Sequence, residues 1–109
     1  MNVLVVLCTC PTIHVAKRLS RSVVEGRLAA CVTILPAAES IYLWEGKLKV
    51  ETEVQLLIKA TSDTFPLLEK VLTDQHPYDN PEILALPVTA AAAPFAQWIS
   101  DQCQLPQPE

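Results

Sequence analysis

The side chains of this 109-residue chain that could bind a transition metal are four cysteines and two histidines, His14 and His76. Soft transition-metal ions prefer thiolate and imidazole ligands, so a metal site would need several of these groups to converge. Cys8 and Cys10 are two residues apart in an apolar segment, and residues with this spacing on a strand point to the same face. A buried free cysteine equally acts as a small hydrophobic residue. This second interpretation stays open for the cysteines at positions 8, 10, 31 and 103.

The cysteines are expected to remain free thiols. The first four residues, Met-Asn-Val-Leu, lack the basic segment of a signal peptide and lead directly into a predicted strand. A well-filled apolar core does not need disulfide staples. The chain has no C-x-x-C pair, which argues against a zinc ribbon and a thioredoxin-like redox motif. We therefore expect a cytoplasmic protein with reduced thiols.

The remaining polar residues do not form a catalytic set. With only two histidines, the chain offers no pattern of nucleophile, base and orienting group. Glycine occurs only at positions 26 and 46, so a glycine-rich phosphate loop cannot form. Glu51 and Glu53 share a strand face, but no polar partner assigns them different acid and base roles. We expect a protein that is not an enzyme.

The apolar pattern predicts the elements that position these side chains. Residues 3–9 form a nearly continuous apolar run before Pro11, which is typical of a buried strand. Thr12 is expected to cap the next helix, whose apolar residues recur at positions 13, 16, 19 and 23. Gly26 is expected to end this helix in the left-handed conformation.

Two long strand-like segments, residues 28–42 and 47–60, are separated by the turn Trp-Glu-Gly-Lys at positions 44–47. This pattern predicts a β-hairpin with positive φ at Gly46. Typical strands have about five or six residues, so the far end of this hairpin should project beyond its own core. Exposed strand edges are normally covered or paired. Pairing with a neighbouring subunit would cover the exposed edge of this hairpin.

The second half of the chain predicts a helix, a loop, a strand and a terminal helix. Ser62 is expected to cap the helix, whose inward residues are at positions 65, 68 and 72. Two prolines and an Asp-Asn pair predict a tight loop over residues 76–82. Residues 83–88 should form the last strand and residues 94–102 the last helix. The residues of that helix expected to face inward are Phe95, Trp98 and Ile99.

The order βαββαβ followed by a helix predicts an α+β, ferredoxin-like fold. It should form one domain over residues 1–104, with a frayed tail at residues 105–109. Two helices would cover one face of the sheet and leave the other face open. Half of the residues are apolar and only 18% are charged, which is more apolar than a small monomer needs. We therefore expect an oligomer in which other copies cover the open face.

Charge and hydropathy exclude two classes of partner. The formal net charge is −4, and the basic residues form no long run, which argues against a nucleic-acid partner. The apolar runs are far shorter than the roughly 20 residues that span a bilayer, so no membrane association is expected.

Several motifs follow one another in order along nearly the whole chain. They are Arg27-x-Ala29-Ala30-Cys31-Val32, Ser40-x-Tyr42-x-Trp44-x-Gly46, Glu53-Val54 with Lys59, and His76-Pro77-Tyr78-x-x-Pro81-Glu82-Ile83. Together they resemble the CutA family of divalent-cation tolerance proteins. The resemblance implies a ferredoxin-like subunit of an intertwined homotrimer, similar in architecture to the PII signalling proteins. It also implies a link to tolerance of copper and other divalent cations.

The resemblance also implies metal ligands. The copper ligands proposed for the family correspond to Cys8 and His76, with copper or another divalent cation not required for folding. The family often has a second histidine where this chain has Gln75, whose amide oxygen is a poor copper ligand. Cys10 could compensate if it shares a face with Cys8.

A second function implied by the resemblance is a PII-like signalling or scaffolding trimer. Aromatic residues at strand ends, together with charged residues of the motifs, would line a cleft between subunits that binds a small molecule. The same residues could instead only stabilise the trimer by stacking and ion pairs. They are Arg27, Tyr42, Trp44, Glu53, Lys59, His76, Tyr78 and Glu82.

Overall fold

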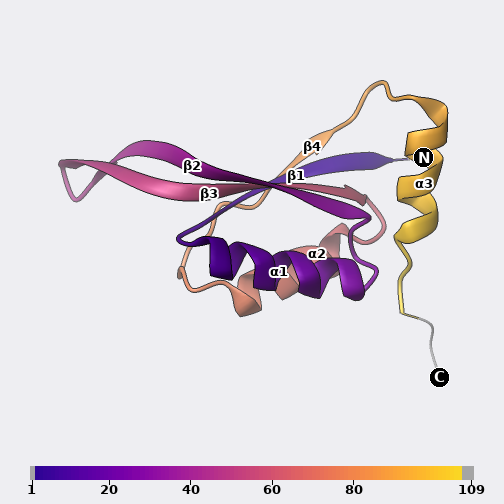
Figure 1. Ribbon diagram of the computed structural model, residues 1–109, viewed down its shortest axis with the longest axis horizontal. Helices are drawn as coiled ribbons and strands as arrows, with labels where there is room; N and C mark the ends of the chain where they lie inside the picture. Colours follow the sequence, from indigo (N-terminus) through magenta and orange to yellow (C-terminus); the bar gives the residue numbers. More distant parts are fainter. Residues whose placement is uncertain (1, 107–109) are drawn as a thin grey trace.

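The computed structural model describes residues 2–106 and confirms the predicted α+β, ferredoxin-like fold with a long hairpin and an extra C-terminal helix (Figure 1). The four strands form one antiparallel sheet in the order β2-β3-β1-β4. Helices α1 and α2 lie side by side on one face of this sheet. The elements are β1 (Val3–Cys10), α1 (Ile13–Glu25), β2 (Cys31–Trp44), β3 (Lys47–Thr61), α2 (Phe65–Gln75), β4 (Leu84–Pro87) and α3 (Ala93–Gln102).

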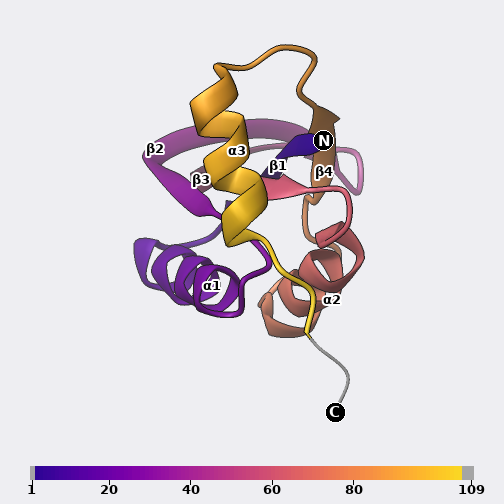
Figure 2. The ribbon, with the colours of Figure 1, turned by 90° about the vertical axis from the view of Figure 1, so that its right-hand side faces the viewer.

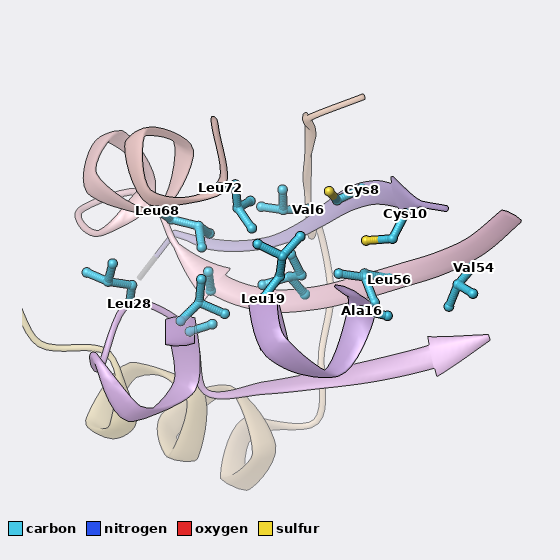
Figure 3. Packing of buried hydrophobic residues seen from close by; sticks show 14 residues of the cluster. Val6, Cys8, Cys10, Ala16, Leu19, Leu28, Val54, Leu56, Leu68 and Leu72 are labelled. Atoms are coloured by element: carbon cyan, nitrogen blue, oxygen red, sulfur yellow. The ribbon is translucent and has the colours of Figure 1, made fainter. Parts of the chain in front are cut away.

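The core lies between the sheet and the two helices (Figure 3). Alternate residues of β1 point toward the helices, as the two-residue period of a strand requires. Cys8 and Cys10 are among them, and β1 pairs with β3 so that they lie opposite Leu56 and Val54. Both cysteines are fully buried in this layer. The same face of β1 therefore supplies core packing and sulfur atoms.

Helix α1 begins as predicted but ends differently. The Thr12 side chain accepts a hydrogen bond from the Val15 amide at 3.2 Å, which confirms the predicted N-cap. The prediction that Gly26 is left-handed is wrong: its φ is −78°, and Arg27 takes the positive φ of 63°. The Leu28 amide donates to the backbone oxygen of Val23, and the Arg27 amide donates to the backbone oxygen of Val24. This pair of hydrogen bonds is the Schellman motif. In that motif the left-handed position is the residue after the C-cap, here Arg27.

Glycine at position 26 has a steric reason instead. A Cβ atom added there would lie 3.0 Å from the backbone oxygen of Ser22. The glycine thus allows a close backbone approach in the last turn of α1.

The β2–β3 hairpin forms as predicted, but β2 covers Cys31–Trp44 instead of residues 28–42. The strand starts later because the amides of Leu28 and Ala29 still bond to Val23 in the turn that ends α1. Glu45 and Gly46 both have positive φ, at 51° and 78°, as a two-residue type I′ turn requires. The two strands extend well past the helices, which confirms the predicted projection (Figure 1). One face of the projecting part carries the exposed pairs Ile41–Val50 and Leu43–Leu48. The hairpin therefore presents apolar side chains that its own subunit does not cover.

Helix α2 has a different N-cap from the predicted one. The prediction for Ser62 is wrong, because Thr64 is the N-cap residue. The Thr64 hydroxyl does not cap the helix but donates to the backbone oxygen of Leu28 at 2.9 Å, tying α2 to the segment after α1. Leu68 and Leu72 are buried as expected, and the helix ends at Gln75 with His76 as its C-cap. The predicted loop follows.

Helix α3 lies across the end of the sheet where β1 begins (Figure 2). Only Ile99 is deeply buried, against Val3 and Ala30. The prediction that Phe95 and Trp98 also face inward is wrong, since their exposed fractions are 48% and 41%. The residues that face inward are Ala96, Ile99 and Cys103, which lie on one side of the helix. The rings of Phe95 and Trp98 stack on each other away from that side.

The sheet face opposite α1 and α2 is only partly covered. Leu7 on β1 lies between Leu57 of β3 and Leu84 of β4, and Val5 pairs with Leu86. Leu84 and Leu86 are exposed. Within residues 2–106, no helix is long and apolar enough to cross a membrane. The domain bounds of 1–104 stay a prediction, and residues 107–109 of the predicted tail lie outside the described residues.

Candidate metal centre

Cys8, Cys10 and His76 converge where the end of β1 meets the end of α2. Their sulfur and ring nitrogen atoms all lie within 4.8 Å of one another. Both cysteines are fully buried, and the exposed fraction of His76 is 8%. Figure 3 shows the two cysteines beside the leucines of the core. The structure thus brings together Cys8 and His76, the two ligands that the sequence singled out, and adds Cys10 to them.

Both ring nitrogens of His76 have hydrogen-bond partners. Nε2 lies 2.7 Å from the backbone oxygen of Thr9, the residue between the two cysteines. Nδ1 accepts a hydrogen bond from the Tyr78 amide at 3.1 Å. Because Nδ1 is an acceptor, the ring proton belongs on Nε2, which donates to Thr9. A metal ion can therefore bind His76 only in place of one of these two hydrogen bonds.

The two thiols influence each other directly. A hydrogen bond with Cys10, followed by burial, raises the pKa of Cys8 far above its usual range. The same hydrogen bond lowers the pKa of Cys10, against the opposing effects of burial and of the negative charge of Glu53, and the positive charge of Arg18 also lowers it. Cys10 is therefore the thiol of the pair that loses its proton first. A thiolate is the form of cysteine that binds metal.

A second polar group adjoins the cluster through Tyr78. The Tyr78 ring lies 4.8 Å from the His76 ring, centroid to centroid. Its hydroxyl donates to the carboxylate of Glu53 at 2.7 Å, and Glu53 itself is buried. Burial, and then the bond to Glu53, raise the pKa of Tyr78 above its usual range. His76, Tyr78 and Glu53 therefore form one connected group at the base of the hairpin.

Gln55 extends this group and was not identified from the sequence. Its side-chain amide donates to the backbone oxygens of Cys8 and Leu56 at 3.2 and 3.1 Å. It also lies 3.4 Å from a carboxylate oxygen of Glu82. The only signal in the sequence was its place on the polar side of the β3 alternation, which many surface residues share. Gln55 links Glu82 to the backbone of the cysteine strand.

The other residues of the predicted cleft lie apart within one subunit. Arg27 donates to the side chain of Gln102 at 2.9 Å, at the far end of α1. Lys59 donates to Thr33 at 2.6 Å on the open face of the sheet. Tyr42 and Trp44 are exposed near the hairpin tip. Of the predicted cleft residues, His76, Tyr78 and Glu53 are joined by direct contacts within one subunit, and Glu82 contacts Gln55.

Gln75, which replaces a histidine of the family pattern, has a structural contact of its own. Its side-chain amide donates to the Ser22 hydroxyl at 3.1 Å, and its backbone oxygen accepts from Arg18 at the same distance. These bonds join α2 to α1 beside an open groove of about 620 Å³ that includes His14. Gln75 and His14 are not among the residues of the cysteine cluster.

The donor set restricts the kinds of metal that fit. Two sulfur atoms and one imidazole nitrogen suit copper and zinc. Magnesium and calcium prefer oxygen ligands. Of the carboxylates near the cluster, Glu53 is bonded to Tyr78 and Glu82 contacts Gln55. The site fits a thiophilic transition metal.

Comparison with known proteins agrees with this architecture. The family model described as CutA1 divalent ion tolerance protein matches residues 4–102. The divalent-cation tolerance protein CutA of Pectobacterium atrosepticum is 48% identical, over 91% of this chain and 90% of its own length. The protein of the same name from Yersinia pestis is 46% identical, over 91% and 83% of the two chains.

Solved structures show the same relationship. CutA from Xylella fastidiosa superposes with a TM-score of 0.93 at 38% identity, over 95% of this chain and all of that chain. CutA1 from Oryza sativa gives a TM-score of 0.93 at 35% identity, over 95% of each chain. On sequence and fold together, this chain belongs to the CutA1 divalent ion tolerance family.

Proposed function

We propose that this chain is a non-enzymatic metal-binding subunit that contributes to tolerance of divalent cations, with copper as its foremost ligand. The observation that supports this most directly is the convergence of Cys8 and His76 within 4.8 Å, with Cys10 beside them. The relatives named divalent-cation tolerance proteins supply the biological context. We place the protein in the cytoplasm, where thiols remain reduced.

The proposed role needs no metal for folding. Leu56, Leu68 and Leu72 are fully buried in the same core as the two cysteines. Burial of such side chains contributes about 1.5–3 kcal/mol each, so the core does not depend on a metal ion. The metal would then be bound by a folded protein.

We also propose that the subunit forms a homotrimer. The exposed residues Ile41, Leu43, Leu48 and Val50 on the hairpin, and Leu84 and Leu86 on the open sheet face, offer apolar surface for other copies. Monomeric proteins rarely leave large contiguous apolar patches exposed. The number three comes from the resemblance to the CutA family. Light scattering at micromolar concentration should give three times the subunit mass of 12.0 kDa, and a monomer mass would contradict the proposal.

Copper titration by calorimetry tests the metal site. The wild type should bind copper, and the double variant Cys8→Ala, His76→Ala should lose affinity by at least about 100-fold, because it removes two ligands. Cys31→Ala is the matched control, since Cys31 is a free cysteine outside the cluster. Circular dichroism confirms that each variant is folded. Unchanged affinity in the double variant would rule out this site.

The second candidate is a PII-like trimer that binds a small molecule between subunits. It is favoured by one observation: a buried carboxylate, Glu53, held by Tyr78 beside His76, close to Gln55 and Glu82. Such convergent polar groups are typical of ligand sites. Crystals of the trimer should then show the same extra density in each inter-subunit cleft. Clefts filled by side chains alone would count against this candidate.

A further inference from the structure

We infer that Cys8 and Cys10 together form a two-sulfur clamp for a soft monovalent metal ion of the Cu(I) class, with His76 as a secondary ligand. This inference rests on the proposed metal-binding function and deepens it. It assigns Cys10 as a primary ligand and names the oxidation state that the site selects. Experiments can disprove either assignment without disproving that Cys8 and His76 bind metal.

The geometry of β1 supports the clamp. The two cysteines are separated by one residue, lie on the same face of one strand and are fully buried. Their donor atoms lie within 4.8 Å of each other. Metal–sulfur bonds of about 2.3 Å, placed end to end, span about 4.6 Å. An ion between the two sulfurs would therefore need only small movements of rigid strand residues.

The hydrogen bonds of His76 favour the two sulfurs over the imidazole as the primary ligands. Binding through the imidazole requires loss of a bond to Thr9 O or to the Tyr78 amide. Binding through the two sulfurs leaves both of these bonds in place. The clamp can therefore bind an ion that needs only two ligands without disturbing the end of α2.

Coordination number then separates the candidate ions. Structural zinc sites in proteins are almost always four-coordinate, and among residues 2–106 only three donors converge here. Cu(I) has a filled d shell, imposes no geometric preference and is stable with two or three soft ligands, which thiolates supply. The fully buried position of both sulfurs also leaves little access for the water that would complete a zinc site. The cluster thus suits Cu(I) better than Zn(II).

The proton balance of Cu(I) binding closes without another reactant. Two S–H bonds break, two metal–sulfur bonds form, and the protons pass to solvent. Two thiolates and one Cu(I) ion leave a net charge of −1. No electron transfer is needed when the metal is supplied as Cu(I).

The experiment is an anaerobic Cu(I) titration of the full-length, reduced protein against a chromogenic Cu(I) chelator, with Zn(II) titrated separately. We expect one Cu(I) per chain and tighter binding of Cu(I) than of Zn(II). Cys10→Ala should lower Cu(I) affinity by at least about 100-fold, as loss of a primary ligand does more than the 10- to 100-fold of an outer-shell change. His76→Ala should lower it less, and Cys31→Ala should leave it unchanged.

Three outcomes would overturn the inference. If Cys10→Ala binds Cu(I) like the wild type while the Cys8→Ala, His76→Ala variant does not bind copper, metal binding stands without the clamp. If Zn(II) binds as tightly as Cu(I), the assigned selectivity is wrong. If the wild type binds neither Cu(I) nor a divalent ion, the inference and the proposed function both fail, and the cysteines only pack the core.

A spectroscopic measurement on the wild type tests the two-sulfur clamp without a variant that could misfold. X-ray absorption at the copper edge of the Cu(I)-loaded wild type should show two sulfur neighbours at about 2.3 Å. A single sulfur among nitrogen or oxygen neighbours would contradict the clamp. This measurement requires no substitution in the core.

Discussion

At the scale of single residues, backbone conformation and hydrogen bonding decide roles that residue type alone leaves open. Gly26 and Arg27 show this most directly. Glycine is the usual left-handed residue after a helix, yet here Arg27 takes the positive φ, and Gly26 precedes it. Stability at this helix end therefore depends on a residue with a Cβ in an unfavourable region.

Arg27→Gly is expected to raise the free energy of unfolding by about 0.5–1 kcal/mol, because glycine removes the left-handed strain. The lost bond to Gln102 is exposed and contributes little. Arg27→Val is the opposing control and should destabilise, since a β-branched residue is strongly disfavoured at positive φ. Urea unfolding of the three proteins measures the difference. An Arg27→Gly variant less stable than wild type would contradict the assignment.

Tyr78→Phe is expected to destabilise the protein by about 1–2 kcal/mol, because it removes the hydroxyl that donates to the buried Glu53 carboxylate. Tyr42→Phe is the control, since Tyr42 is exposed. Thermal and urea unfolding near neutral pH compare the two variants. Equal stability of both variants and the wild type would show that the bond contributes nothing.

The same tyrosine predicts a pH dependence. The pKa of Tyr78 is raised in the folded protein, so its contribution to stability is complete below the ordinary tyrosine pKa of about 10. That contribution is lost as the pH rises through the higher pKa of the folded state. The stability gap between wild type and Tyr78→Phe should therefore narrow above about pH 10. A difference in unfolding free energy between the two proteins that increases above pH 10 would contradict this prediction.

At the scale of elements, the β2–β3 hairpin is longer than its own core requires. Its projecting part carries Leu43 and Leu48 as a cross-strand pair, and the exposed fraction of Leu43 is 71%. No contact within the described residues of the subunit buries these two leucines. Contact with another copy of the chain would bury them.

Leu43→Asp should lower the oligomer mass without unfolding the subunit. In an isolated subunit, a substitution at such an exposed position changes stability by less than about 0.5 kcal/mol. In the proposed trimer, it would bury a charge against apolar surface, which is strongly unfavourable. Light scattering gives the mass and circular dichroism the fold. Lys49→Asp, on the other face of the hairpin, is the control, and an unchanged mass for Leu43→Asp would exclude this surface from the interface.

At the scale of the whole molecule, the proposed metal site lies inside a core that is already complete. Within the described part of the chain, fourteen buried residues form one cluster that includes Cys8 and Cys10. Metal binding should therefore add to a fold that exists without it. This differs from small metal domains, which unfold when the metal is removed.

Treatment with a chelator should leave the melting temperature of the protein unchanged. Copper at about 100 times its dissociation constant should instead raise the free energy of unfolding by about 2.7 kcal/mol, because the ion binds only the folded state. Differential scanning calorimetry of the chelated and loaded protein measures both effects. Unfolding on chelation would show that the metal is part of the fold.

The sequence by itself determined the features that depend on near neighbours in the chain. The two-residue period of β1 placed Cys8 and Cys10 on one face, and Gly46 marked the hairpin turn. The N-cap of α1 at Thr12 also followed from local chemistry. Such features are predictable because strand alternation, turns and caps involve residues only a few positions apart.

Local patterns were insufficient where a tertiary contact competes with them. Ser62 and Thr64 both suit a helix N-cap, and Thr64 takes the position while its hydroxyl bonds to Leu28, 36 residues away. In α3, Phe95 and Trp98 are as apolar as Ile99, but only Ile99 meets the sheet. Which face of a helix is buried depends on where the helix is docked.

Only the tertiary structure decided the site. The family resemblance named Cys8 and His76, but it could not show that Cys10 joins them or that Gln75 turns toward Ser22. His76 is 67 residues from Thr9 along the chain, and the bond between them exists because α2 packs on the sheet with its end beside the end of β1. Packing of distant segments fixes such contacts, and no local period encodes them.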